Sequence, residues 1–254
     1  MESRAYYGNW IPKRVLLLFF FASVLLFIPA VFLDNSAPKR ILYSLSALSF
    51  AFVLYLGYAY YLLGRRGGGL QKQFYQLVID KLPWPGNGKA LDIGTGNGAL
   101  AIELAKGFPS SEVTGVDMWS KPWSYLQESC ENNAILEGVA NRTRFIHAGA
   151  ESLPFDDESF DAVVSNFVFH SVKIEDRLYL LKEALRVLRK GGCFSFQDLF
   201  NSEFYDDPKN LEGVLRSWGL EDVQFAKSSE YIRIPLALRI NHIAGNSGVL
   251  FGTK

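Results

Sequence analysis

The chain has 254 residues, with 26 basic and 26 acidic side chains, so no excess of positive charge marks it as a nucleic-acid-binding protein. Its only two cysteines, Cys130 and Cys193, exclude a disulfide framework and a zinc site built on cysteine pairs. A chain of this length holds one α/β domain of ordinary size and a further segment, but not two full domains.

Two long apolar stretches come first. Residues 15–33 and 41–63 carry no charged side chain, and each, as a helix, would cross the roughly 30 Å hydrocarbon core of a bilayer. The short polar connector between them, DNSAPKR, predicts an antiparallel helical hairpin. We therefore predict that residues 1–66 form a membrane anchor with two transmembrane helices.

The cations near the hairpin predict its orientation. Six of them flank its outer ends, whereas only Lys39 and Arg40 occupy the connector. Since the more cationic side is retained in the cytosol, we expect a multi-pass membrane protein with both termini and the domain that follows in the cytosol. Two alternatives remain open at this point: a cleaved signal peptide at residues 15–33, and a hairpin buried in a soluble protein.

From Gly67 onward the chain alternates between predicted strands and helices, and its formal charge is −5, from 19 basic and 24 acidic side chains. The expected strands are 89–93, 112–117, 143–148, 160–166 and 191–198, and the expected helices are 71–81, 99–108, 124–139 and 174–190. The last helix carries leucines at helical spacing, Leu178, Leu181, Leu185 and Leu188, which we expect in the core.

Such alternation predicts a mostly parallel sheet with helices on both faces. Residues 222–228 and 248–254 are expected to close the sheet as a C-terminal antiparallel strand pair. The predicted fold class is therefore α/β, with a Rossmann-like, doubly wound, seven-stranded sheet in a domain of residues 67–254, preceded by the transmembrane hairpin.

A glycine-rich turn follows the first predicted strand of this domain. Residues 91–98 read LDIGTGNG, and Asp117 ends the next strand. Glycines at such a turn let the backbone approach a ligand, and the helix that follows favours polar or negative groups at its N-terminus. An acid at the position of Asp117 is suited to ribose hydroxyls. These features suit NAD and S-adenosylmethionine (SAM) equally.

Four segments decide between these ligands by resemblance: LDIGTGNG, GVD, AESLPFDDESFDAVVSNFVFH and LKEALRVLRKGGCFSF. Together they make residues 90–198 resemble the class I SAM-dependent methyltransferases, especially the type 11 group that contains ubiquinone and menaquinone methyltransferases. The resemblance implies a SAM-dependent methyltransferase with SAM as its cofactor.

The resemblance also implies the cofactor-binding residues. Asp92, Gly94, Gly96 and Gly98 would shape the pocket for the methionine part of SAM, and Asp117 would bind the ribose hydroxyls. Met118, Ala150 and Glu151 would lie around the adenine, and Asn166 beneath the sulfonium. One position departs from the family pattern: an Asp often precedes the Ala of the adenine-side loop, and this chain has Gly149 there. Glu151 is the candidate to replace it.

His170 and Asp198 are the candidate catalytic residues. His170 follows the fourth strand, where the resemblance implies a histidine facing the acceptor, and its ordinary pKa suits a general base. Asp198 ends the fifth strand. The alternatives are a structural histidine at the edge of the crevice and a carboxylate that caps the following loop. Since His147 and His242 have no partner at metal spacing, no metal site is expected.

The acceptor is expected to be a small hydrophobic molecule or a lipid, because a tether to the bilayer raises the local concentration of membrane-borne acceptors. The residues expected near it are Phe167, Phe169, Leu199, Phe200, Phe204 and Tyr205, although each could equally belong to the core. The alternative is that the hairpin only sets localisation.

Two other functions compete with this one. A non-catalytic SAM-binding membrane module remains open, since the adenine loop departs from the family pattern. An NAD(P)-dependent reductase would need Tyr-x-x-x-Lys on a helix, but the matching pair, Tyr205 and Lys209, encloses Pro208.

Overall fold

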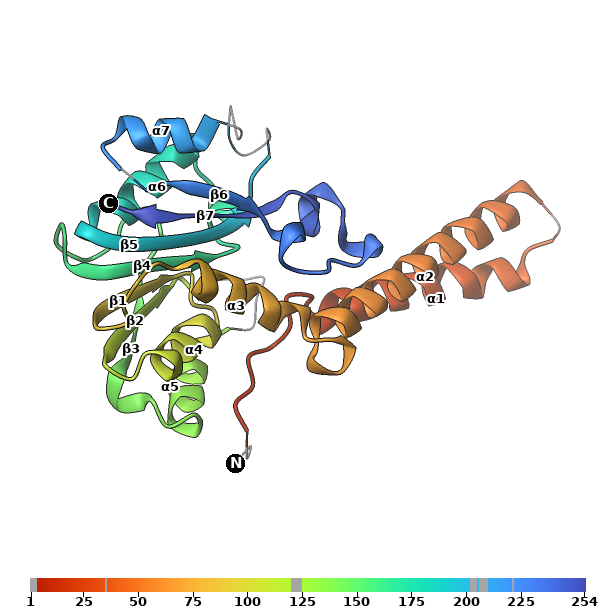
Figure 1. Ribbon diagram of the computed structural model, residues 1–254. Coiled ribbons are helices and arrows are strands. Elements are labelled where there is room, and N and C mark those ends of the chain that lie inside the picture. Colours follow the sequence, from red (N-terminus) through yellow and green to blue (C-terminus); the bar gives the residue numbers. More distant parts are fainter. Residues whose placement is uncertain (1–3, 35, 120–124, 202–204, 206–209, 221) are drawn as a thin grey trace. The chain divides into compact units, whose positions relative to one another are not determined.

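The computed structural model describes residues 4–34, 36–119, 125–201, 205, 210–220 and 222–254 (Figure 1). Its contacts divide the chain into two compact units. One unit is Asn9–Lys72, and the other joins Met1–Gly8 to Gln73–Lys254. The division after Lys72 lies close to the domain boundary expected after residue 66. No sequence pattern indicated, however, that the residues before the hairpin belong to the other unit.

The Asn9–Lys72 unit is built on two helices, α1 (Lys13–Phe32) and α2 (Ala37–Leu63), that are long and apolar enough to cross a membrane. The second helix starts before its predicted stretch because Pro38 suits the first turn of a helix. Most large apolar side chains of α1 are exposed, and Phe32 reaches 83%. This exposure counts against a hairpin buried in the core of a soluble protein.

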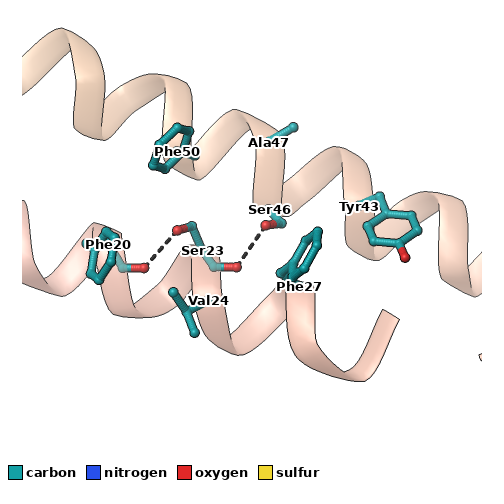
Figure 2. A pocket seen from close by; sticks show the side chains of 8 residues that line it. All are labelled: Phe20, Ser23, Val24, Phe27, Tyr43, Ser46, Ala47 and Phe50. Carbon is teal, nitrogen blue, oxygen red and sulfur yellow. Dashed lines mark hydrogen bonds between the residues drawn. The ribbon is translucent and has the colours of Figure 1, made fainter. Parts of the chain in front are cut away.

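Small hydroxyl side chains join the two helices. The Ser46 hydroxyl donates to the Ser23 carbonyl at 2.8 Å, and the Ser49 hydroxyl donates to the Phe19 carbonyl at 2.9 Å. These pairs run in opposite directions along the chain, so the helices are antiparallel. Figure 2 shows Ser23 and Ser46 facing each other in a hollow whose other lining side chains are Phe20, Val24, Phe27, Tyr43, Ala47 and Phe50. Serine lets the two helices approach closely, and its hydroxyl is satisfied by a backbone carbonyl.

The second unit contains a seven-stranded sheet in the order β3-β2-β1-β4-β5-β7-β6. The strands are β1 (Gly88–Ile93), β2 (Ser111–Asp117), β3 (Thr143–His147), β4 (Phe160–Asn166), β5 (Leu188–Leu199), β6 (Gln224–Lys227) and β7 (Ser247–Thr253). The first five are parallel, and β7 is antiparallel to both β5 and β6. The predicted doubly wound sheet with its C-terminal antiparallel pair is confirmed.

Helices cover both faces of this sheet (Figure 1). The helices of this part of the chain are α3 (Leu70–Lys81), α4 (Ala99–Gly107), α5 (Gln127–Leu136), α6 (Arg177–Arg186) and α7 (Leu211–Ser217). One buried cluster includes Val78, Leu100 and Cys130, and the other includes Leu181 and Leu215. The chain moves from β1 outward to β3 and returns to β4 beside β1. A crevice for a ligand is expected at the carboxyl ends of β1 and β4, where this reversal occurs.

The predicted helix at residues 174–190 is too long at both ends. The helix α6 starts at Arg177, after the Asp176 carboxylate caps it by accepting from the Leu178 amide, and ends at Arg186. Leu188 instead begins β5 and pairs with Phe160. The apolar spacing continues past the helix end because Leu188 is also buried, as a strand residue.

Candidate functional site

Three glycines shape the turn between β1 and α4. Gly94, Gly96 and Gly98 have φ of 72°, 59° and 80°, which only glycine adopts without strain. A Cβ on Gly94 would also collide with the side chain of Val168, which follows β4. The turn therefore keeps its backbone close to the segment after β4, at the reversal point of the sheet.

The buried Asp92 side chain holds this turn in place. Its side chain is 1% exposed, and Oδ2 accepts hydrogen bonds from the Thr95 hydroxyl at 2.7 Å and the Ala101 amide at 3.1 Å. Burial raises the pKa of this carboxyl to about 7, although both hydrogen bonds oppose the rise. Asp92 thus holds the turn to the first residues of α4, and its part in a cofactor pocket stays a prediction.

Asp117 ends β2 and faces the same turn. Its Oδ2 accepts from the Gly96 amide at 2.9 Å, and its Oδ1 accepts from the Trp119 amide at 2.7 Å. The Trp119 indole N–H donates to the Gly96 carbonyl at 2.8 Å, and this residue has an unusual φ of 41°. A non-glycine residue in this conformation is often part of a ligand site. Trp119 was not among the predicted residues, whereas Met118 was, and its side chain is 45% exposed.

The loop after β3 contains Ala150, which is buried, and Glu151, which is exposed. The Glu151 carboxylate folds back onto Gly149 and lies where a side chain on residue 149 would begin. It therefore lies next to the position at which the family pattern has an acid, and its role toward the adenine stays a prediction.

Arg186 and Glu183 on α6 hold the far end of this loop. The Glu183 carboxylate accepts from the Leu153 amide at 2.8 Å, and the Arg186 guanidinium donates to the carbonyls of Leu153 at 3.1 Å and Phe155 at 2.8 Å. The two side chains also pair with each other at 2.8 Å, and this pairing is the main cause that lowers the pKa of Glu183. The loop is therefore fixed to α6 rather than left mobile.

Asn166, at the end of β4, offers a buried acceptor to a ligand. Within the part of the chain that the structure describes, its Oδ1 atom has no hydrogen-bond partner, and the same is true of Oδ1 of Asn97 on the glycine turn. Buried polar atoms normally find partners. An acceptor at each of these positions suits a ligand that donates N–H groups, as the ammonium group of SAM does.

His170 and Asp198 lie together. Nδ1 of His170 is 2.5 Å from Oδ1 of Asp198, whose side chain is fully buried. The carboxylate also accepts from the amides of His170 at 3.2 Å and Leu199 at 2.7 Å. Because a carboxylate accepts hydrogen bonds, Nδ1 is the ring nitrogen that would donate to it, and in a neutral ring the lone pair would then be on Nε2. The two residues, which the sequence analysis named as separate candidates, therefore form a hydrogen-bonded dyad.

Aromatic residues adjoin the dyad. The Phe167 ring lies 6.2 Å from the His170 ring, and the Phe74 ring of α3 packs edge-on against Phe167 at 5.1 Å. Phe167 has a φ of 56°, another conformation that is rare outside glycine. Burial raises the pKa of Tyr205 well above its ordinary value, with a smaller contribution from Asp198.

The other residues expected near the acceptor are placed differently. Phe169 and Leu199 are each 1% exposed and belong to the core, and Phe200 stacks against Tyr205. Phe204 lies outside the described residues. The apolar wall beside the dyad is therefore formed by Phe167 and Phe74, and the second of these was not predicted.

Among the described residues, no group of His, Cys, Asp and Glu side chains is arranged to hold a metal ion. His147 ends β3 with its ring 6.1 Å from the Trp119 ring. For the reductase alternative, the Tyr205 side chain is buried, and Lys209 lies outside the described residues.

The residues before the hairpin reach the glycine turn. The Tyr6 amide donates to Oδ1 of Asn133 at 2.9 Å, and Nδ2 of Asn133 donates to the carbonyls of Tyr6 and Asn97, each at 3.0 Å. A Cβ on Gly8 would meet the Tyr125 ring at 3.1 Å and the Asn97 amide at 3.3 Å. Residues 4–8 thus cover part of the turn, which no local sequence signal predicted.

Comparison with known proteins finds similarity to methyltransferases. Residues 91–196 match the family described as a methyltransferase domain. The ubiquinone/menaquinone biosynthesis C-methyltransferase UbiE of Geotalea daltonii is 33% identical over 125 residues, which cover 49% of this chain and 51% of that protein. The demethylmenaquinone methyltransferase of Roseiflexus castenholzii is 39% identical over 125 residues, covering 49% of this chain and 48% of that protein. The chain thus spans about half the length of the curated relatives it matches.

Among solved structures, a putative methyltransferase in complex with the Haloferax volcanii Trm112 activator has a similar fold. Its TM-score is 0.53 at 19% identity, covering 77% of this chain and 96% of that one. At this identity the likeness concerns the fold alone. The family resemblance inferred from the four sequence segments is confirmed by the family match and the curated relatives.

Proposed function

We propose that this chain, whose residues 91–196 form a class I SAM-dependent methyltransferase domain, is an enzyme that methylates a hydrophobic acceptor at a membrane. The observation that carries the proposal is the dyad of His170 and Asp198, 2.5 Å apart at the carboxyl edge of the sheet that also carries the glycine turn. A module that only bound SAM would have no need of a base at this position.

The residues of the crevice fit SAM. Asp117 would bind the ribose hydroxyls, Gly94 and Gly96 would border the methionine part, and Glu151 would accept from the adenine amino group. Bound SAM supplies an electrophilic methyl group on a sulfonium. Asn166, with its buried Oδ1 acceptor, would hold the donor groups of this ligand. The protein contributes chiefly by positioning two reactants in line and by excluding water.

The dyad has a defined part in the reaction. Nε2 of His170 would take the proton that the acceptor loses as its new bond to the methyl group forms. Asp198 would keep the ring in the tautomer with Nδ1 protonated and would stabilise the positive charge that the ring gains. Asp198 is itself held by the Leu199 amide, so the dyad is oriented before the acceptor binds.

The acceptor is proposed to be a quinone-type or similarly hydrophobic small molecule. Phe167 and Phe74 place aromatic rings beside His170, and aromatic walls are typical of sites for apolar ligands. The printed names of the two curated relatives refer to ubiquinone, menaquinone and demethylmenaquinone.

The hairpin is proposed to anchor the enzyme as a two-span membrane protein. The apolar side chains of α1 and α2 that are exposed in the chain alone would be covered by lipid. Residues 4–8 contact the unit that holds the proposed catalytic residues, which supports an arrangement with both ends of the hairpin on one side of the bilayer. The cations at these ends favour the cytosolic side.

The test uses the full chain in lipid nanodiscs with tritium-labelled SAM and a naphthoquinol that lacks its ring methyl group. We expect label to enter the quinone fraction. His170→Gln should lower kcat roughly 100-fold or more without changing the Kd for SAM, as the loss of a general base predicts. Ser171→Ala, at an exposed position of the same turn, is the matched control and should keep full activity.

Each outcome of this test is informative. Binding of SAM without transfer to the naphthoquinol or to any lipid fraction would favour the non-catalytic module. Transfer that is unchanged in both His170→Gln and Asp198→Asn would leave the enzyme standing and remove the dyad from its mechanism.

A further inference from the structure

The segment between β6 and β7 exposes aliphatic side chains although it is firmly attached to the sheet. It contains two short helical turns, Leu236–Leu238 and Asn241–Gly245. Its inward side chains are buried: Ile232, Ile234, Leu238 and Ala244. Its outward side chains include Leu236, which is 81% exposed, Ile240 at 46% and Ile243 at 37%. In Figure 1 this dark-blue segment projects beyond the ends of its two strands.

The segment also carries two exposed cations, Arg233 and Arg239, which are close in sequence to the three aliphatic residues. Its one acid, Glu230, is exposed at the start of the segment, and residues 231–254 contain no Asp or Glu. This differs from the chain from Gly67 onward, whose formal charge is −5. Arg239 is also fixed, because its Nε donates to the Ile234 carbonyl at 2.8 Å. We call Arg233, Leu236, Arg239, Ile240 and Ile243 the β6–β7 patch.

The strand register locates the patch at the catalytic edge of the sheet. Lys227, the last residue of β6, and Asp198 of β5 both pair with Gly248. The segment therefore leaves and re-enters the sheet level with the carboxylate of the dyad. The Phe200 amide also donates to the carbonyl of Asn246, the residue before β7, at 3.0 Å.

We propose that the β6–β7 patch is a second membrane contact of this protein, in addition to the hairpin. The aliphatic side chains enter the interface between headgroups and acyl chains, and the two arginines bind anionic headgroups. The occupant is a lipid bilayer because the same chain carries two apolar helices that bring one within reach. The inference rests on the membrane anchoring proposed above.

This contact turns the carboxyl edge of the sheet toward the lipid. A hydrophobic acceptor dissolved in the bilayer then reaches His170 without crossing bulk water. The hairpin raises the local concentration of such an acceptor, whereas the patch sets the orientation in which it is received.

The test places a fluorescent probe on the patch of the full chain. Leu236→Cys is labelled with an environment-sensitive dye, and Ile135→Cys on α5 is the matched control, since Ile135 is 64% exposed in the same unit. The native Cys130 and Cys193 are buried, and unsubstituted protein reports any labelling of them. Each protein is reconstituted in phosphatidylcholine vesicles with and without about 30% phosphatidylglycerol, a fraction that gives an anionic surface.

We expect the probe at residue 236 to shift to shorter wavelength and to be quenched by bilayer-embedded quencher lipids, more strongly with phosphatidylglycerol. The control probe should show neither effect, and Arg233→Gln with Arg239→Gln should remove the dependence on anionic lipid. Equal behaviour of the two probes would overturn the proposal. A shielded probe that lipid quenchers do not reach would also overturn it, in favour of a protein partner.

An activity assay tests the proposed membrane contact independently. Leu236→Asp should raise the KM for a long-chain, bilayer-dissolved quinol about tenfold, the effect of one aliphatic side chain losing its apolar contact. It should leave the KM for a short-chain soluble quinol and the Kd for SAM unchanged. An unchanged KM for both acceptors in an active, vesicle-bound enzyme would overturn the patch and leave the proposed function intact. A chain that does not float with vesicles would overturn the membrane anchoring, and the patch with it.

Discussion

Replacing Asp92 with Asn should change how the stability of the catalytic unit depends on pH. Asp92 is buried beneath the glycine turn, and desolvation raises its pKa to about 7 from an ordinary value of 3.8. An Asn at this position has no charge to bury. Its amide oxygen can still accept from the Thr95 hydroxyl and the Ala101 amide, which both bond to one oxygen of Asp92.

The direction in which stability changes with pH follows from proton linkage. The folded pKa is the higher one, so between about pH 4 and pH 7 the folded state keeps a proton that the unfolded chain has lost. Stability therefore falls as the pH rises through this window and becomes level above it. A shift of about three units corresponds to about 4 kcal/mol at pH 8. About 2 kcal/mol of this is already lost at pH 5, so about 2–3 kcal/mol is lost between pH 5 and pH 8.

Thermal unfolding of the full chain in nanodiscs, followed by tryptophan fluorescence, measures the effect. The Tm of Asp92→Asn minus that of the unsubstituted protein should rise by about 5–10 °C between pH 5 and pH 8, at about 2–4 °C per kcal/mol for a unit of this size. Asp156→Asn, at an exposed position, should give no such trend. A Tm difference for Asp92→Asn that stays constant with pH would refute the reasoning.

Three further predictions concern the cofactor site. Asp117→Ala should weaken SAM binding by about 3 kcal/mol or more, measured by calorimetry on folded protein, because a charged acceptor of two ribose hydroxyls is lost; unchanged affinity would remove Asp117 from the site. Arg186→Gln should speed amide exchange in loop 150–155 and weaken SAM binding, since two loop carbonyls lose their donor; exchange as slow as in the unsubstituted protein would disprove this anchoring role. Gly8→Ala should release residues 4–8 to proteolysis, whereas Gly138→Ala should not. Both glycines have a φ of 74°, but only Gly8 has neighbours within 4 Å of an added Cβ, and equal proteolysis would contradict the docking.

Local patterns explain what could be predicted from the sequence. The glycine turn and Asp117 were identified because each depends on residues next to a strand end. The pairing of His170 with Asp198 was not, because it depends on how β4 and β5 align across 28 positions of sequence. The end of α6 was misjudged because Leu188 is buried both as a helical and as a strand residue.

Contacts between residues far apart in the chain cannot be predicted from local sequence patterns. The contact of Tyr6 with Asn133 joins residues 127 positions apart. The ring contact of Phe74 with Phe167 joins α3 to the segment that follows β4. No sequence motif marks either of these contacts. Both arise because the sheet brings distant segments to its carboxyl edge.

The docking of the N-terminal residues also dictates an order of events during synthesis. Residues 4–8 leave the ribosome before the two apolar helices, whereas Asn133 and Tyr125 are made after both. Since domains fold as their residues emerge, the proposed anchoring implies that the N-terminal segment stays undocked while the helices enter the bilayer. Under that proposal it would reach its place only after both helices had inserted. A chain with a single inserted helix would leave Tyr6 and Asn133 on opposite sides of the membrane. If the proposed anchoring holds, the contact between Tyr6 and Asn133 therefore forms only in chains that have inserted both helices.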